Sequence, residues 1–146
     1  MLANGYLKLA KRKILFLCTG NSYRSQMAEG FAQKEGWEAF SAGTKPEGEE
    51  NPLSIKIMAE LGIDISHHKS ESVNEYLKED FTLIATVCDN ARESCPLFTG
   101  NFIHTIHYGF NDPAKAIGNH RKIITIYRQV RDEIGEWVER LNKEYM

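Results

Sequence analysis

A cysteine, an arginine and a serine stand close together near the start of the chain, in the stretch CTGNSYRS at 18–25. Cys18 ends a short apolar run that is typical of a buried strand, and Arg24 follows six positions later, where a helical pattern begins. Arginine carries a planar fork of donors that can hold two oxygens of an oxyanion. A guanidinium and a helix N-terminus also lower the pKa of a nearby thiol, and the thiolate is the nucleophilic form. The spacing therefore predicts attack by Cys18 on an anion held by Arg24.

The residues between Cys18 and the helix fit an anion-binding loop that ends at Ser25. They are Thr19, Gly20, Asn21, Ser22 and Tyr23. Gly20 and Asn21 tolerate positive φ, so backbone N–H groups can turn inward as a nest for a tetrahedral anion. The helix N-terminus adds partial positive charge, and the Ser25 hydroxyl can donate to the Cys18 thiolate. The GxxxxGK[ST] spacing of nucleotide-binding loops is absent, which disfavours nucleotide hydrolysis.

A cysteine at a strand end is more often a packing residue than a nucleophile, because buried cysteines behave as small hydrophobic side chains. Arg24 argues against that interpretation, since a cation is unfavourable in the first turn of a helix. For each of the two other cysteines, Cys88 and Cys95, burial is as good an explanation as a chemical role. A zinc site made of both with His104 and His107 is an alternative, but their spacing is wider than the usual C-x2-4-C.

Strand-like and helix-like segments alternate along the chain. We expect strands over 13–18, 37–41, 81–87 and 101–106, and helices over 23–35, from 52 to a stop at Gly62, and over about 120–143. This alternation predicts a parallel sheet covered on both faces, and hence an α/β fold. The chain shows no repeat and no second core, so we expect residues 1–146 to form a single domain.

Composition excludes several classes of protein. Hydrophobic residues make up 42% and charged residues 26% of the 146 residues, and the net charge is −2, so no global field favours nucleic acid or membrane. No run of apolar residues is long enough to cross a membrane, and the first residues do not resemble a signal peptide. Three cysteines without a CxxC pair make a structural disulfide framework improbable. We therefore expect a cytoplasmic protein with reduced thiols.

The stretch CTGNSYRSQMAEG resembles the signature loop of the low-molecular-weight tyrosine phosphatase superfamily, in particular its thioredoxin-coupled arsenate reductase branch. The resemblance extends along nearly the whole chain, through SAG at 41–43, GIDIS at 62–66, TVCDNARESCP at 86–96, GFNDPA at 109–114 and VRDEI at 130–134. It implies a four-stranded parallel sheet in a three-layer domain. It also implies arsenate as substrate, with phosphate or sulfate as analogues, and no cofactor.

The resemblance also implies a redox relay. Cys18 attacks arsenate, Cys88 attacks Cys18 and releases arsenite, and Cys95 attacks Cys88, leaving a Cys88–Cys95 disulfide that an external dithiol reduces. Thioredoxin is the favoured reductant, and a glutaredoxin–glutathione route stays open. Asp112 matches the acid that protonates the leaving oxygen, although Asp–Pro is also a common turn pair. A monomer involved in arsenical resistance is the expectation that follows.

Geometry adds a consequence to this relay. In a continuous helix, residues 88 and 95 would stand about 10.5 Å apart along the axis. A disulfide needs Cα atoms within roughly 7 Å of one another. We therefore expect the segment between Cys88 and Cys95 to loop out or melt when the disulfide forms.

Two other functions stay open. A phosphatase for phosphotyrosine or a small phosphoester would need only Cys18, Arg24 and Asp112. A non-catalytic module that binds oxyanions or senses redox state is disfavoured, because the nucleophile, the arginine and the candidate acid are all present.

Some positions depart from the family pattern. Tyr23 stands where relatives often carry cysteine or a small residue. Some relatives bind potassium behind the loop, where Asn21, Glu29 and Ser41 would match, but Lys69 departs from an oxygen ligand, so we predict no required metal. The adjacent His67 and His68 are expected to be solvated or capping.

Overall fold

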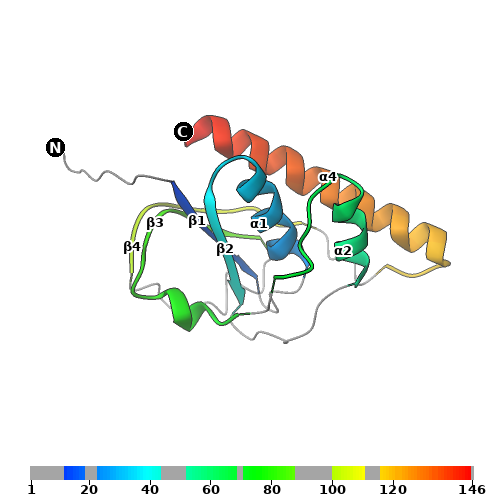
Figure 1. Ribbon diagram of the computed structural model, residues 1–146, viewed down its shortest axis with the longest axis horizontal. Helices are drawn as coiled ribbons and strands as arrows, with labels where there is room; N and C mark the ends of the chain where they lie inside the picture. The colour runs from blue at the N-terminus through cyan, green and yellow to red at the C-terminus, as the bar shows by residue number, and fades with distance from the viewer. Residues whose placement is uncertain are drawn as a thin grey trace.

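The computed structural model describes residues 12–18, 23–43, 52–68, 71–87, 100–110 and 116–145. Its strands are β1 (Lys13–Cys18), β2 (Glu38–Gly43), β3 (Asp80–Thr86) and β4 (Asn101–His107). Its helices are α1 (Arg24–Lys34), α2 (Pro52–Ala59), the short 3-10 helix η1 (Val73–Tyr76) and α4 (His120–Glu144) (Figure 1). These bounds agree with the expected elements within a few residues. The 3-10 helix is an addition that the sequence pattern did not indicate.

The four strands form one sheet in the order β2-β1-β3-β4, and every neighbouring pair is parallel. The pairing of β1 with β2 and with β3 continues to the carboxyl ends of the strands, where Cys18 pairs with Gly43 and Leu17 pairs with Thr86. Because all strands run the same way, their carboxyl ends meet at one edge of the sheet. The predicted α/β class and the four-stranded parallel sheet are confirmed, and the edge that carries Cys18 is the one where a ligand site belongs.

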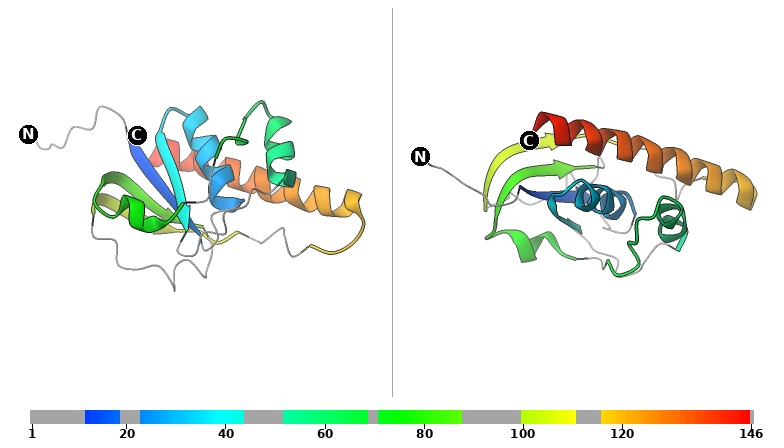
Figure 2. Two further views of the ribbon diagram at one scale, coloured as in Figure 1. Left: turned by 60° about the horizontal axis from the view of Figure 1, so that its bottom comes forward. Right: turned by 45° about the horizontal axis from the view of Figure 1, so that its top comes forward.

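The core consists of two hydrophobic clusters, one on each face of the sheet. Alternate residues of β1 divide between them, with Ile14 and Phe16 in the larger cluster and Leu15 and Leu17 in the smaller one. The larger cluster is completed by α1, α2 and α4, and Figure 2 shows α4 running past the strands with α1 beside it. The smaller cluster packs against η1.

The last helix forms as its pattern predicts. Asn119 caps its N-terminus by accepting a hydrogen bond from the Lys122 backbone N–H at 2.9 Å. Its apolar stripe is buried and comprises Ile124, Tyr127, Val130, Ile134, Trp137, Val138 and Leu141. The first turn after α2 closes at Gly62, whose φ of 75° lies in the left-handed region that favours glycine.

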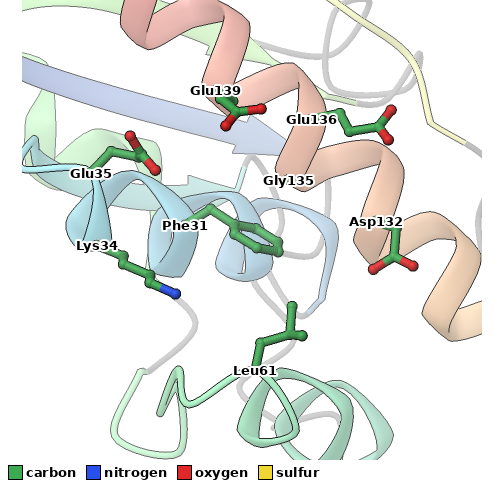
Figure 3. Close-up of a pocket in the computed structure, with 8 residues that line it drawn as sticks. All are labelled: Phe31, Lys34, Glu35, Leu61, Asp132, Gly135, Glu136 and Glu139. Atoms are coloured by element: carbon green, nitrogen blue, oxygen red, sulfur yellow. The ribbon is translucent and has the colours of Figure 1, made fainter.

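Close helix packing depends on two glycines within helices. A Cβ at Gly30 of α1 would lie 2.8 Å from the Ile65 Cγ2 atom, so the segment after α2 can approach α1 only because a side chain is absent. A Cβ at Gly135 of α4 would lie 2.9 Å from the Phe31 ring, which reaches across from α1 (Figure 3). The groove beside this contact is lined by residues of α1, α4 and the turn after α2, and it contains no predicted site residue.

A buried arginine ties α2 to α4. The Arg131 Nη1 donates to the Ile57 carbonyl at 2.9 Å and to the Glu60 Oε1 at 2.9 Å, while Arg128 donates to the same carboxylate. The hydrogen bonds from Arg128, followed by those from Arg131, lower the pKa of Glu60 to about 2. The carboxylate therefore stays charged at neutral pH. Among the described residues, no helix combines the length and apolar character that a membrane crossing needs.

Candidate active site

Cys18 is the last residue of β1 and is buried, with 4% of its surface exposed. It lies on the face of the sheet that α1 and α4 cover, since it belongs to the larger hydrophobic cluster. The Val87 backbone N–H donates to the Leu17 carbonyl at 2.9 Å, so the end of β3 is fixed beside the end of β1. The thiol therefore lies at the carboxyl edge of a sheet whose strand ends are hydrogen-bonded together.

Ser25 places a hydroxyl against this thiol. The distance between the Cys18 Sγ and the Ser25 Oγ is 2.9 Å, and Ser25 is fully buried. Ser25 is the second residue of α1, so this contact joins the start of the helix to the end of β1. A hydroxyl in this position can donate to a thiolate, and such a donor stabilises the charged form of sulfur.

Arg24 is held at the same end of the molecule by a backbone carbonyl. Its Nη1 donates to the Phe110 oxygen at 2.9 Å, and Phe110 follows the end of β4. The Phe110 N–H in turn donates to the Val87 carbonyl at 3.3 Å. The chain segments after β3 and β4 thus help to place the arginine. The sequence pattern missed this role of Phe110, because a backbone acceptor leaves no signal in residue type.

Aromatic rings fix the position of Phe110. Its ring meets Trp137 of α4 edge-on at 5.3 Å between centroids and stacks with Tyr108 at 4.8 Å. Trp137 also packs edge-on against Phe16 of β1 at 5.9 Å. This aromatic contact, worth about 0.5–1.5 kcal/mol per pair beyond burial, links α4 to the carbonyl that holds Arg24.

A second polar cluster lies behind α1. The Ser41 hydroxyl of β2 donates to the Glu29 Oε1 at 2.5 Å, and the His68 Nδ1 lies 3.6 Å from the same oxygen. Burial raises the pKa of Glu29 to about 7, against the lowering effect of the Ser41 hydrogen bond. Burial likewise lowers the pKa of His68 to about 4. His68 is therefore neutral at pH 7, and its contact with Glu29 is not an ion pair there.

His68 corrects one expectation. It was predicted to be solvated or capping, but it is buried, whereas its neighbour His67 is exposed. The polar residues on both sides concealed its burial, because they carry no hydrophobic periodicity. Tyr76 likewise lies inside the protein, and its hydroxyl donates to Glu71.

Two of the three potassium positions implied by the resemblance, Glu29 and Ser41, lie together in this cluster. The third, Asn21, and also Lys69, lie outside the described residues. In the part of the chain that the structure describes, no group of three or more His, Cys, Asp or Glu side chains is placed to hold a metal ion.

The zinc alternative with both His104 and His107 is wrong. These residues are three apart on β4, and successive side chains of a strand point to opposite faces. His104 pairs with Leu83, which belongs to the larger cluster, and its ring contacts Tyr145. His107 pairs with Thr86, whose Oγ1 lies 2.6 Å from its Nδ1. One ion cannot reach both rings.

Four predicted site residues are described, namely Cys18, Tyr23, Arg24 and Ser25, and the structure brings them together at the strand edge. The others lie outside the described residues: Thr19, Gly20, Asn21, Ser22, Cys88, Cys95 and Asp112. One described segment ends at Val87, directly before Cys88, and another ends at Phe110, two residues before Asp112. Both ends lie at the edge that carries Cys18, as the hydrogen bonds of Val87 and Phe110 show.

The sequence and the fold of this chain are similar to those of known proteins. Residues 13–146 match the sequence profile of the low molecular weight phosphotyrosine protein phosphatase family. The chain belongs to this family. Within it, the chain is 43% identical over 132 residues to an arsenate reductase of Halalkalibacterium halodurans, a match that covers 88% of this chain and 94% of that relative.

Two solved arsenate reductase chains have the same fold as this family member. One is described as in the phosphate binding state, with a TM-score of 0.78, and one as in oxidized state, with a TM-score of 0.77. Each is 28% identical, and each match covers 92% of this chain and 99% of the solved chain. The likeness therefore includes both the sheet and the helices around it.

Proposed function

We propose that this chain reduces arsenate to arsenite, with Cys18 as the nucleophile. The observation that carries the proposal is the thiol of Cys18 at the carboxyl edge of the sheet, 2.9 Å from the Ser25 hydroxyl, with Arg24 held at the same end by the Phe110 carbonyl. A thiolate, a hydroxyl donor and a guanidinium are what attack on a tetrahedral oxyanion requires. The arsenate reductases among the relatives support arsenate as the substrate.

The proposed first step joins sulfur to arsenic. The amides of Thr19–Ser25 and the Arg24 guanidinium hold three oxygens of arsenate, and the Cys18 thiolate attacks arsenic. A sulfur–arsenic(V) bond forms, and the opposite hydroxyl group of the hydrogen arsenate leaves as water after taking a proton from Asp112. A thiolate is favoured at Cys18 because the N-terminus of α1 and the arginine both stabilise negative charge.

The next steps transfer two electrons to arsenic. The Cys88 thiolate attacks the Cys18 sulfur, so that a Cys18–Cys88 bond forms while the sulfur–arsenic bond breaks and its electron pair stays on arsenic, which leaves as arsenite. Cys95 then attacks Cys88, releasing Cys18 as a thiolate and leaving a Cys88–Cys95 disulfide. Reduced thioredoxin restores both thiols and becomes oxidised. The position of Val87 beside Leu17 supports this relay, because Cys88 follows Val87 directly.

The second candidate function is phosphatase activity, and the family itself favours it. Cys18, Arg24 and Asp112 would suffice, with a phosphocysteine intermediate that water hydrolyses. Phosphate and arsenate share shape and charge, so we expect weak phosphatase activity alongside arsenate reduction.

The decisive assay is arsenate-dependent oxidation of reduced thioredoxin. We expect Cys18→Ser, Cys88→Ser and Cys95→Ser each to abolish turnover. Hydrolysis of an aryl phosphate should be lost only in Cys18→Ser, because the relay cysteines do not take part in hydrolysis. Replacing thioredoxin by glutaredoxin with glutathione identifies the electron donor. Efficient hydrolysis of phosphotyrosine by a chain that does not reduce arsenate would overturn the ranking of the two functions.

A further inference from the structure

We propose that the Tyr23 side chain is a positioning residue for the Arg24 guanidinium, which it holds in place before the oxyanion binds. The inference rests on the proposed function only for the identity of the oxyanion. It adds a role for a side chain, because an anion-binding loop needs only the backbone of this residue.

The guanidinium is contacted from two sides. The Arg24 Cζ lies 5.1 Å from the centroid of the Tyr23 ring, within the ~6 Å at which a cation and a ring attract. The Arg24 Nη1 donates to the Phe110 oxygen at 2.9 Å. The contact from Nη2 to the Tyr23 hydroxyl measures 3.5 Å, the outer limit of a hydrogen bond. The ring is therefore the stronger of the two contacts that Tyr23 makes with the arginine.

Tyr23 is itself fixed. It is the residue before α1, and its carbonyl accepts the first helical hydrogen bond, from the Met27 N–H at 2.8 Å. Its half-buried ring packs against the larger hydrophobic cluster. Its hydroxyl does not cap the helix, whereas serine, threonine, aspartate or asparagine at this position usually would. The position thus carries a ring beside the arginine in place of a capping side chain.

A fixed guanidinium changes anion binding. Arginine has many rotamers, and ordering them when the anion arrives opposes binding. Tyr23 and the Phe110 carbonyl hold the side chain in advance, so less freedom is lost on binding. The same placement keeps the positive charge at the sheet edge that carries Cys18, where it would favour the thiolate. Loss of the ring should therefore weaken oxyanion binding and raise the pKa of the thiol, with little loss of folded protein.

The test compares Tyr23→Leu and Tyr23→Phe with Tyr145→Leu, a matched control on the half-buried tyrosine after α4. Sulfate affinity is measured as protection of Cys18 from alkylation, and the alkylation rate is followed against pH. We expect Tyr23→Leu to raise the sulfate Kd and the arsenate KM by about threefold to tenfold, with a smaller change in kcat. Tyr23→Phe keeps the ring and should weaken sulfate binding less than Tyr23→Leu does.

Unchanged sulfate affinity and an unchanged alkylation profile in Tyr23→Leu would overturn the proposal. So would a loss confined to thermal stability or to the active fraction, which is what a merely structural role predicts. Equal weakening in Tyr23→Phe and Tyr23→Leu would show that the ring does not position the arginine, and would also overturn the proposal. If the wild-type chain did not reduce arsenate, the proposed function would fail, while sulfate protection and the thiol titration would still decide the role of Tyr23.

Discussion

At the residue scale, two neighbours of Cys18 are expected to act on its sulfur in different ways. Ser25 acts through a short contact at 2.9 Å inside the protein, where a hydrogen bond is stronger than in water. Arg24 acts through its charge, and its position depends on Phe110. A change at Ser25 should therefore alter the thiol alone, whereas a change at Arg24 should alter both the thiol and the binding of the anion.

Ser25→Ala tests the first of these effects. Without the hydroxyl, the Cys18 thiolate loses a donor, so its pKa should rise and its alkylation rate at pH 7 should fall by about threefold to tenfold. Sulfate protection should change little, because Arg24 stays in place. The pH dependence of iodoacetamide labelling measures the shift. A profile identical to that of the wild-type protein would show that Ser25 does not stabilise the thiolate.

Glu29 gives a second prediction at this scale. Its pKa is about 7 in the folded protein, against 4.5 as the ordinary value, because burial disfavours the carboxylate. The folded state therefore holds its proton more tightly, and the free energy of unfolding falls as pH rises from 4.5 to 7. Glu29→Gln removes this penalty. The free energy of unfolding of the variant, relative to that of the wild type, should therefore rise by on the order of 3 kcal/mol across that range.

Urea unfolding at pH 5 and pH 8 measures this difference. Glu136→Gln, an exposed position on α4, is the matched control and should show no such trend. A gap between Glu29→Gln and the wild type that is the same at both pH values would contradict the shifted titration.

At the element scale, α1 positions the site because it packs closely on its neighbours. The N-terminal turn of α1 carries Arg24 and Ser25, and Gly30 lies in the same helix against the buried Ile65. Any displacement of the helix at Gly30 would also move the residues that face Cys18. The packing of this helix and the chemistry of its first turn are therefore linked.

Gly30→Ala and Gly135→Ala form a matched pair that tests this packing. Alanine in a helix gains about 1 kcal/mol over glycine. At position 30 its Cβ would meet Ile65, a stiff and buried side chain, and such overpacking costs about 1–3 kcal/mol. At position 135 it would meet the end of the half-buried Phe31 ring, which can rotate away.

We therefore expect Gly30→Ala to destabilise the protein by up to about 2 kcal/mol and Gly135→Ala to change its stability less. Urea unfolding measures both variants. Greater destabilisation by Gly135→Ala would show that the α1–α4 contact, and not the α1 contact with Ile65, limits the approach of the helices.

The elements could be predicted from the sequence because their patterns are local. The apolar run before Cys18, the stripe of α4 and the glycine after α2 each carry a period or a residue preference. The Phe110 carbonyl and the burial of His68 could not be predicted in this way. Each depends on contacts between segments far apart in the sequence, and neither alters the residue types around it.

At the scale of the whole molecule, the parallel sheet collects the ends of β1, β3 and β4 at one edge. Cys18 lies there, and Cys88 and Asp112 follow within two residues of described positions at that edge. Parallel strands of this kind could therefore bring the proposed nucleophile, resolving thiol and acid to one edge of the sheet. We expect the segment between Cys88 and Cys95 to change shape if the proposed disulfide forms.

Hydrogen exchange tests this change of shape. In the oxidised protein, amides in residues 88–96 should exchange faster than in the reduced protein, because a helix cannot span a Cys88–Cys95 disulfide. Peptides from α4 should exchange equally in both states and serve as the internal control. Identical exchange over 88–96 would contradict the expected loss of order.

The chain has two tryptophans, and the fold gives them very different surroundings. Trp37 lies before β2 under the guanidinium of Arg12, at the end of the sheet away from Cys18. Trp137 touches the ring of Phe110, whose carbonyl holds Arg24. A Trp37→Phe variant would therefore keep a single tryptophan, in contact with the residue whose carbonyl holds Arg24, so its emission could follow binding of the proposed oxyanion in real time without an added dye.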